Sequence, residues 1–67
     1  MDNRYFLEFN YKKQKTLIDF ADIRIIESKD NKSRIFLYSD INEYVEVDET
    51  YRQVINKIKK LYASRYK

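Results

Sequence analysis

Apolar side chains recur at steps of three and four from residue 50 to residue 66, which is the period of a helix. Thr50 stands three residues before Gln53, the spacing of a capping box. Acidic residues precede the stretch and basic residues end it, and both suit the helix dipole. The pattern predicts an amphipathic helix over residues 50–66, whose apolar stripe is Tyr51, Val54, Ile55, Ile58, Leu61, Tyr62 and Tyr66.

Before residue 50 the apolar positions alternate with a period of two, which is typical of strands. Ile25 and Ile26 break the alternation, which predicts either a bulge or a side chain that reaches a second layer. The stretch 34–39 is apolar on both faces, which predicts a central strand. Polar stretches at 12–15, 28–33 and 40–42 predict turns or loops. We expect strands over residues 5–11, 34–39 and 43–47, and over 16–27 either one long bent strand or two short ones.

The order of strands first and helix last predicts an α+β domain spanning residues 1–67. We expect a small antiparallel β-meander of three to four strands, followed by one C-terminal amphipathic helix packed on one face. The opposite face would carry Phe6, Phe36, Tyr38 or Tyr44, which is more apolar surface than a small monomer exposes. The pattern therefore favours a homo-oligomer, such as a dimer or a ring.

Composition removes most enzyme chemistry. The 67 residues include no cysteine, histidine, glycine or proline. Disulfides, thiolate or imidazole metal sites, imidazole-activated nucleophiles and glycine-rich phosphate loops are therefore excluded. Glu46 and Asp48 would share a strand face that suits Mg²⁺, but an acidic approach to the helix start is the interpretation we favour. We expect no enzymatic activity, no cofactor and no membrane span, and a cytoplasmic location.

The run from Thr16 to Tyr62 resembles the small bacterial FlbD-type proteins of the flagellar and swarming-motility group. The resemblance lies in the stretch 21–27 (Ala-Asp-Ile-Arg-Ile-Ile-Glu), a polar loop, a hairpin and a capped helix start at 50–55. It covers about two thirds of the chain, in pattern rather than in invariant residues. That family usually has Asn-Gly in the hairpin, where this chain has Ser39-Asp40-Ile41-Asn42. The resemblance implies a non-enzymatic regulatory module.

Tyrosine supplies the main functional signal. Seven tyrosines in 67 residues are more than a small core can hide, and tyrosine is enriched at protein interfaces. We therefore predict a protein-binding or regulatory module of adaptor or inhibitor type that self-associates through its sheet or helix. The candidate interface residues are Phe36, Tyr38, Tyr44, Tyr62 and Tyr66.

Nucleic-acid binding is the alternative function. Residues 51–67 hold six Lys or Arg and no acid, whereas residues 1–50 have a net charge of −3. Basic side chains contact phosphates, and strand aromatics such as Tyr5, Tyr11, Phe36 and Tyr38 would stack on bases. The candidate phosphate contacts are Lys12, Lys13 and Lys15 at a hairpin and Lys57, Lys59, Lys60 and Arg65 on the helix.

Overall fold

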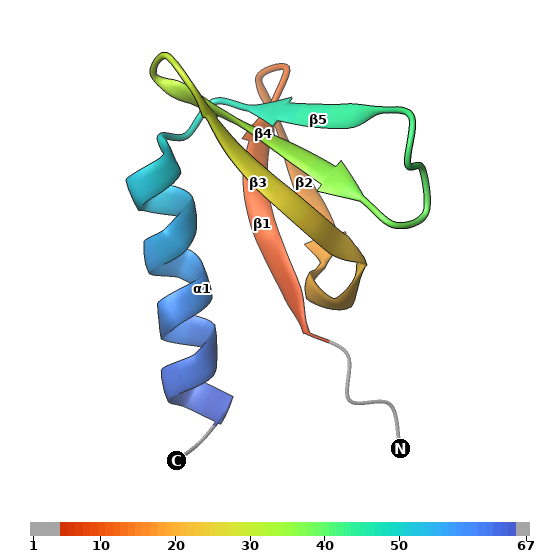
Figure 1. The fold of residues 1–67 in the computed structure, drawn as a ribbon. Coiled ribbons are helices and arrows are strands. Elements are labelled where there is room, and N and C mark those ends of the chain that lie inside the picture. The colour runs from red at the N-terminus through yellow and green to blue at the C-terminus, as the bar shows by residue number, and fades with distance from the viewer. Residues whose placement is uncertain (1–4, 66–67) are drawn as a thin grey trace.

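The computed structural model describes the backbone of residues 5–65 and the side chains of residues 5–63. Five strands precede one helix, with a short 3-10 turn between the second and third strands (Figure 1). The predicted α+β class is confirmed, but there are five strands instead of three to four, because the turn η1 divides the stretch 16–27. The elements are β1 (Phe6–Tyr11), β2 (Gln14–Asp19), η1 (Phe20–Asp22), β3 (Ile23–Lys29), β4 (Lys32–Leu37), β5 (Tyr44–Val47) and α1 (Tyr51–Arg65).

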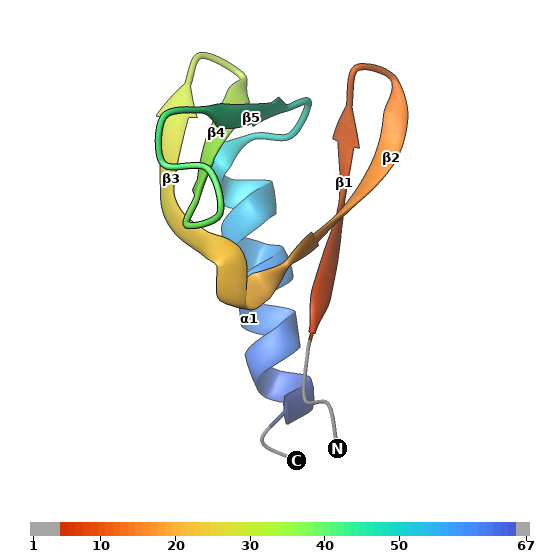
Figure 2. The same ribbon diagram turned by 90° about the vertical axis from the view of Figure 1, so that its right-hand side faces the viewer.

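The strands form two antiparallel sheets and not the single meander that we expected. β1 pairs with β2, and a second sheet has the order β3-β4-β5, so the prediction of a central strand at 34–39 is confirmed. The backbone N–H of Asp48, just after β5, donates to the carbonyl oxygen of Asn10 in β1 at 2.8 Å. Figure 2 shows the two sheets facing each other, with α1 lying between them on their open side.

The core lies where the two sheets and the helix meet. Within residues 51–63 of α1, Val54 is fully buried, and Ile58 and Leu61 pack against the same core. Burying a large apolar side chain contributes about 1.5–3 kcal/mol, so the packing of the two sheets and the helix on this core stabilises all three. The buried apolar residues are Leu7, Phe9, Ile18, Ile35, Val47 and Val54.

The start of the helix has the predicted capping box. The Thr50 N–H donates to Gln53 Oε1 at 2.8 Å, and the Gln53 N–H donates to Thr50 Oγ1 at 3.2 Å. These reciprocal bonds satisfy two backbone donors that no helical carbonyl reaches. They fix the first turn of α1, which follows β5 closely in the chain.

The predicted bulge is also present. The pairing register between β3 and β4 shifts between Ile23 and Ile25, so one residue of β3 is left over. As a result, Ile25 is exposed while Ile26 packs against the core. Just before the bulge in the chain, the Asp22 carboxylate accepts hydrogen bonds from the Ser39 N–H at 2.9 Å and from the Ser39 hydroxyl at 2.6 Å. These bonds connect η1 to the end of β4.

The predicted loop over residues 28–33 is wrong. β3 and β4 continue to Lys29 and Lys32, and only Asp30 and Asn31 remain as the turn. Ser33 is fully buried, and its hydroxyl donates to the Glu49 carbonyl oxygen at 2.8 Å. A buried hydroxyl with a hydrogen-bond partner costs little, so a polar residue occupies a core position here.

Candidate functional site

The face of the β3–β4–β5 sheet that points away from the core is called here the outer sheet face. Cross-strand pairing places Ile25, Phe36 and Tyr44 in one row across it. The next row holds Glu27, Arg34 and Glu46. An apolar row therefore borders a charged row on a surface that no other element of residues 5–65 covers.

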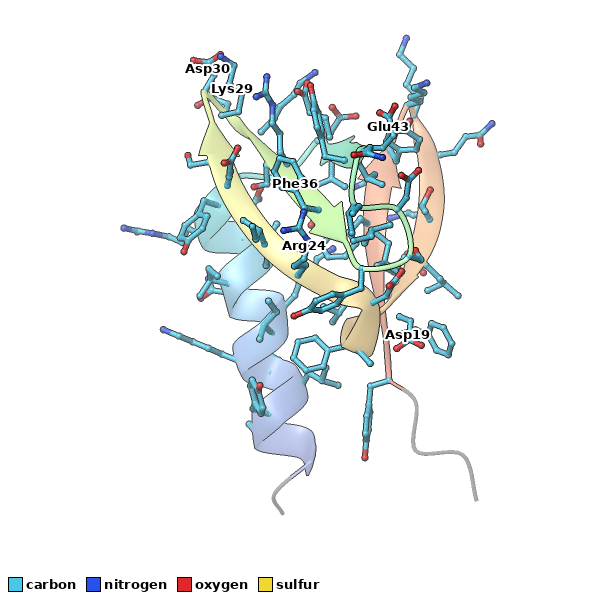
Figure 3. The ribbon with its side chains drawn as sticks, turned by 45° about the vertical axis from the view of Figure 1, so that its right-hand side comes forward. Asp19, Arg24, Lys29, Asp30, Phe36 and Glu43 are labelled. Carbon is cyan, nitrogen blue, oxygen red and sulfur yellow. The ribbon has the colours of Figure 1, made fainter. Side chains whose placement is uncertain are left out.

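Two arginines and two aromatic rings pack together on this face. The rings of Phe36 and Tyr44 are 5.3 Å apart between centroids. The Arg34 guanidinium lies 4.8 Å from the Tyr44 ring centroid, and that of Arg24 lies 6.0 Å from the Phe36 ring centroid. Figure 3 shows Arg24 beside Phe36 on the same side of the sheet. Each contact contributes about 0.5–1.5 kcal/mol, which holds the side chains in a defined arrangement.

The candidate interface residues separate into two groups. Phe36 and Tyr44 are in contact on the outer sheet face. Tyr38 follows β4, two residues after Phe36, and is 61% exposed. Tyr62 lies on α1, where its ring meets the Phe20 ring edge-on at 5.6 Å. Tyr66 lies outside the described residues. Phe36 and Tyr44 therefore share one surface, Tyr38 follows at the end of β4, and Tyr62 lies on α1 against Phe20.

Two acidic residues near this face, Glu46 and Asp48, have cationic partners. Lys32 Nζ lies 3.4 Å from Asp48 Oδ1 and 3.9 Å from Glu46 Oε2. Arg34 Nε lies 3.5 Å from Glu46 Oε1, although it makes no hydrogen bond of good geometry. The Lys32 ammonium thus pairs with the two carboxylates, Glu46 and Asp48, that were considered as Mg²⁺ ligands. Among residues 5–63, no three acidic side chains gather closely enough to hold a metal ion.

The candidate phosphate contacts are spread over several places. Lys12 and Lys13 form the exposed tip of the β1–β2 hairpin, while Lys15 pairs with Glu8 at 3.5 Å. Lys60 flanks a groove beside Asn10, and Lys59 flanks a different groove on α1. The Arg65 side chain lies outside the described residues. The candidate lysines with described side chains are therefore divided between the hairpin tip, β2 and separate parts of α1.

Lys57 has an internal role. Its ammonium lies 2.5 Å from Glu49 Oε1, donates to the Glu8 carbonyl oxygen, and sits 4.7 Å from the centroid of the Phe9 ring. Glu49 is 6% exposed, and its second carboxylate oxygen accepts the Asn10 N–H at 2.9 Å. Three groups therefore hold this ammonium: the Glu49 carboxylate, the Glu8 carbonyl oxygen and the Phe9 ring.

The aromatic residues considered for base stacking do not share a sheet. Tyr5 and Tyr11 belong to the β1 segment, whereas Phe36 and Tyr38 belong to the β4 segment of the other sheet. Sheet-type RNA binders need their aromatic residues side by side on one surface. This arrangement does not supply that platform.

Sequence reasoning missed Arg24 and Ile25 as members of the outer sheet face. The bulge turns Ile25 outward, and the sequence signal for it was the Ile25-Ile26 pair. No comparable signal marked Arg24, whose side chain makes no hydrogen bond or ion pair with a described residue. An arginine packed only against an aromatic ring keeps donors for a partner.

No helix within residues 5–65 is both long enough and apolar enough to cross a membrane. Comparisons of the chain with protein-family models, curated proteins and solved structures find no match.

Proposed function

We propose that this chain is a small, non-enzymatic protein-binding module whose outer sheet face contacts a partner protein. The observation that supports it is the packed cluster of Arg24, Arg34, Phe36 and Tyr44. Tyrosine, phenylalanine and arginine are enriched at protein interfaces, and tyrosine and arginine dominate their hot spots. Rings that are already held by neighbours lose little conformational freedom on binding.

The mixed charge of this face supports a protein partner over a nucleic acid. Glu27, Arg34 and Glu46 alternate in sign across the three strands. A phosphate backbone binds to clustered positive charge, and acids within the surface repel it. A protein surface with its own mixed charges fits this alternation.

Self-association, a regulatory role of adaptor or inhibitor type, and a cytoplasmic location belong to the same proposal. The apolar row Ile25, Phe36 and Tyr44 supports self-association, since it is exposed or half-buried in the single chain. The FlbD-type pattern supports the regulatory role. The absence of cysteine suits a reducing compartment.

Affinity capture from the native host with matched variants tests this proposal. The double variant Tyr38→Ser/Tyr44→Ser removes two exposed rings, one from the outer sheet face and one from the end of β4. The control variant Tyr51→Ser removes a ring of similar exposure, 45% against 41% for Tyr44, from α1. We expect the wild type and the control to retain the same partner and the double variant to lose it. Equal recovery by all three chains contradicts the proposal.

Nucleic-acid binding remains the second candidate, and the hairpin tip supports it. Lys12 and Lys13 are exposed and form no ion pair with residues 5–63. A labelled oligonucleotide titrated at low and moderate salt tests this function, because phosphate contacts weaken steeply as salt rises.

A further inference from the structure

One edge of β5 has backbone groups that no strand pairs with. In an antiparallel ladder, alternate residues direct their N–H and C=O toward opposite neighbours. Val45 and Val47 direct theirs toward Ile35 and Ser33 of β4. Tyr44, Glu46 and Asp48 therefore point theirs the other way. The Asp48 N–H follows this rule, since it donates away from β4 to the carbonyl oxygen of Asn10.

The two sheets are joined at Asp48 and separate along β5 toward Tyr44. The edge of β5 at Tyr44 and Glu46 therefore has no pairing strand within residues 5–65. Unpaired strand edges are templates for further strands, and proteins usually cover them or block them with charge. Lys57 and Glu49 cover the edge of β1 in this way, at Glu8 and Asn10. At Tyr44 and Glu46 the backbone amide and carbonyl groups stay available.

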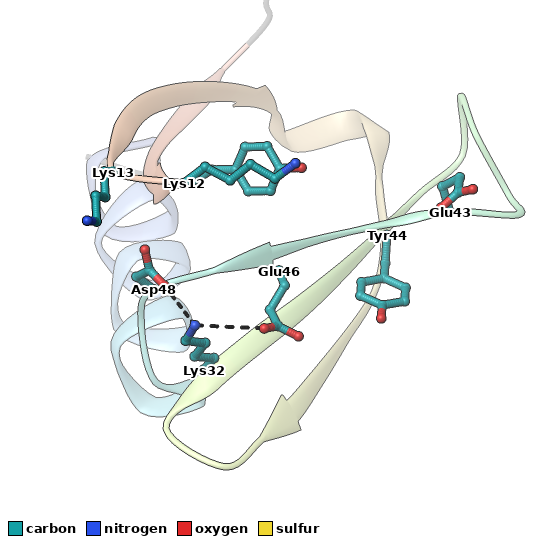
Figure 4. A pocket seen from close by; sticks show the side chains of 8 residues that line it. Lys12, Lys13, Lys32, Glu43, Tyr44, Glu46 and Asp48 are labelled. Atoms are coloured by element: carbon teal, nitrogen blue, oxygen red, sulfur yellow. Dashed lines mark ion pairs between the residues drawn. The ribbon is translucent and has the colours of Figure 1, made fainter.

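A groove lies between this edge and the tip of the β1–β2 hairpin (Figure 4). Its volume of about 590 Å³ falls within the roughly 300–1,000 Å³ of ligand sites in proteins. In Figure 4 the groove runs along β5, from Lys12 and Lys13 at the Asp48 end to Glu43 at the other end. Tyr44 lines the groove and also belongs to the outer sheet face.

The charges in the groove are neutralised at its centre and unpaired at its ends. Lys32 pairs with both Glu46 and Asp48. Lys12 lies over the Tyr11 ring at 5.1 Å from its centroid, and neither Lys12 nor Lys13 pairs with an acid of the described residues. The hairpin end of the groove therefore presents two ammonium groups that lack a counter-charge.

The hairpin tip holds these ammonium groups at a conformational cost. Lys12 and Lys13 have φ values of 51° and 64°, in the left-handed region that glycine and asparagine adopt most readily. Two-residue hairpins of this kind usually carry Asn-Gly. Residues held in disfavoured backbone conformations cluster at active sites and binding sites.

We propose that an extended peptide segment adds to β5 as a further strand and places an acidic side chain against Lys12 and Lys13. Backbone hydrogen bonds to Tyr44 and Glu46 supply strand pairing, as in other complexes that extend a sheet edge. Alternate side chains of the segment lie beside Tyr44 on the outer sheet face. This inference rests on the proposed protein-binding function and names the form of the bound segment.

Selection from a displayed library of random octapeptides against the intact chain tests the inference. We expect enriched sequences that carry Asp or Glu at one end and β-branched or aromatic residues at alternate positions. A synthetic copy of an enriched peptide then provides the probe for binding measurements. Methylation of its backbone nitrogens at alternate positions removes the strand-pairing donors and abolishes binding, whereas methylation at the intervening positions has little effect.

The double variant Lys12→Asn/Lys13→Gly separates charge from folding, because it places the preferred residues of the turn at the tip. We expect this variant to bind the peptide with an affinity lower by about tenfold, which corresponds to the loss of two exposed charge contacts. The control Lys59→Asn/Lys60→Asn removes the same charge from α1 and leaves the affinity unchanged.

The inference is overturned if no peptide is enriched, if both double variants bind the probe equally, or if the hairpin variant loses only oligonucleotide binding. Host capture that depends on Tyr38 and Tyr44 is measured separately. If that capture succeeds while peptide selection fails, the proposed function survives and the strand-addition inference falls. If the tyrosine variant captures as well as the wild type, the proposed function fails by itself.

Discussion

The Lys57 ammonium lies 2.5 Å from the carboxylate of Glu49, eight residues earlier in the chain. The other oxygen of Glu49 accepts the Asn10 N–H, and Lys57 also donates to the Glu8 carbonyl oxygen. The two side chains thus satisfy backbone groups on the edge of β1 that faces away from β2. An ion pair between the helix and the residue before its cap therefore holds the first sheet against the helix.

Removing either partner is expected to destabilise the fold by different amounts. Lys57→Met leaves a nearly buried carboxylate without its cation and costs about 2–3 kcal/mol. Glu49→Gln keeps an acceptor for Asn10 and leaves a lysine that is 34% exposed, so it costs less, about 1–2 kcal/mol. Urea unfolding of both single variants and of the double variant measures the coupling. Strictly additive losses would show that the pair contributes nothing.

The hairpin tip offers a stabilising substitution. Lys13 has a φ of 64°, and the left-handed region costs a residue with a Cβ roughly 1–2 kcal/mol. Lys13→Gly is expected to raise the free energy of unfolding by about 1 kcal/mol, after the greater chain entropy of glycine is subtracted. Lys15→Gly, in the regular part of β2, is the control and should lower it. A lower thermal midpoint for Lys13→Gly would contradict the turn geometry.

The capping box is expected to contribute measurably to the docking of α1. Thr50→Ala removes the side-chain oxygen that accepts the Gln53 N–H and should cost about 1 kcal/mol. Arg52→Ala, at an exposed position of the same first turn, should change the stability little. Thermal unfolding followed by circular dichroism compares the two variants. Equal midpoints would mean that the helix start is held by packing alone.

Local patterns predicted the parts of the fold that depend on local chemistry. The spacing of Thr50 and Gln53, the run of apolar residues around Phe36 and the Ile25-Ile26 pair each identified a feature that the structure contains. Each depends on neighbours within a few positions, where side-chain period and hydrogen-bonding reach decide the outcome.

Features that depend on distant residues were not predictable from the pattern. The local sequence predicts a loop at Ser33. The residue lies in a strand and is buried because its hydroxyl donates to the Glu49 carbonyl oxygen at 2.8 Å. Lys57 reads as a solvent-facing lysine until its contacts with Glu8, 49 residues earlier, are seen. The turn η1, which separates β2 from β3, is likewise held by a distant contact, since the Asp22 carboxylate accepts two hydrogen bonds from Ser39.

Nucleic-acid binding is expected to be weak and unspecific. Lys57 is held inside the fold, and Lys15 pairs with Glu8, so few lysines remain for phosphates. A labelled single-stranded oligonucleotide should bind only at low salt, and Lys12→Asn/Lys13→Gly should reduce that binding further. Tight binding that survives moderate salt, or binding that needs Lys59 and Lys60 instead, would favour the alternative function.

The footprint of the captured partner on the isotopically labelled chain tests the central claim most directly. Amide chemical shifts, measured with and without the partner, report which surface it covers. The account predicts that the largest changes gather on β4 and β5, around Arg34, Phe36, Tyr44 and Glu46, and at the hairpin tip. Changes confined to the exposed face of α1, around Lys59 and Asn56, would contradict it.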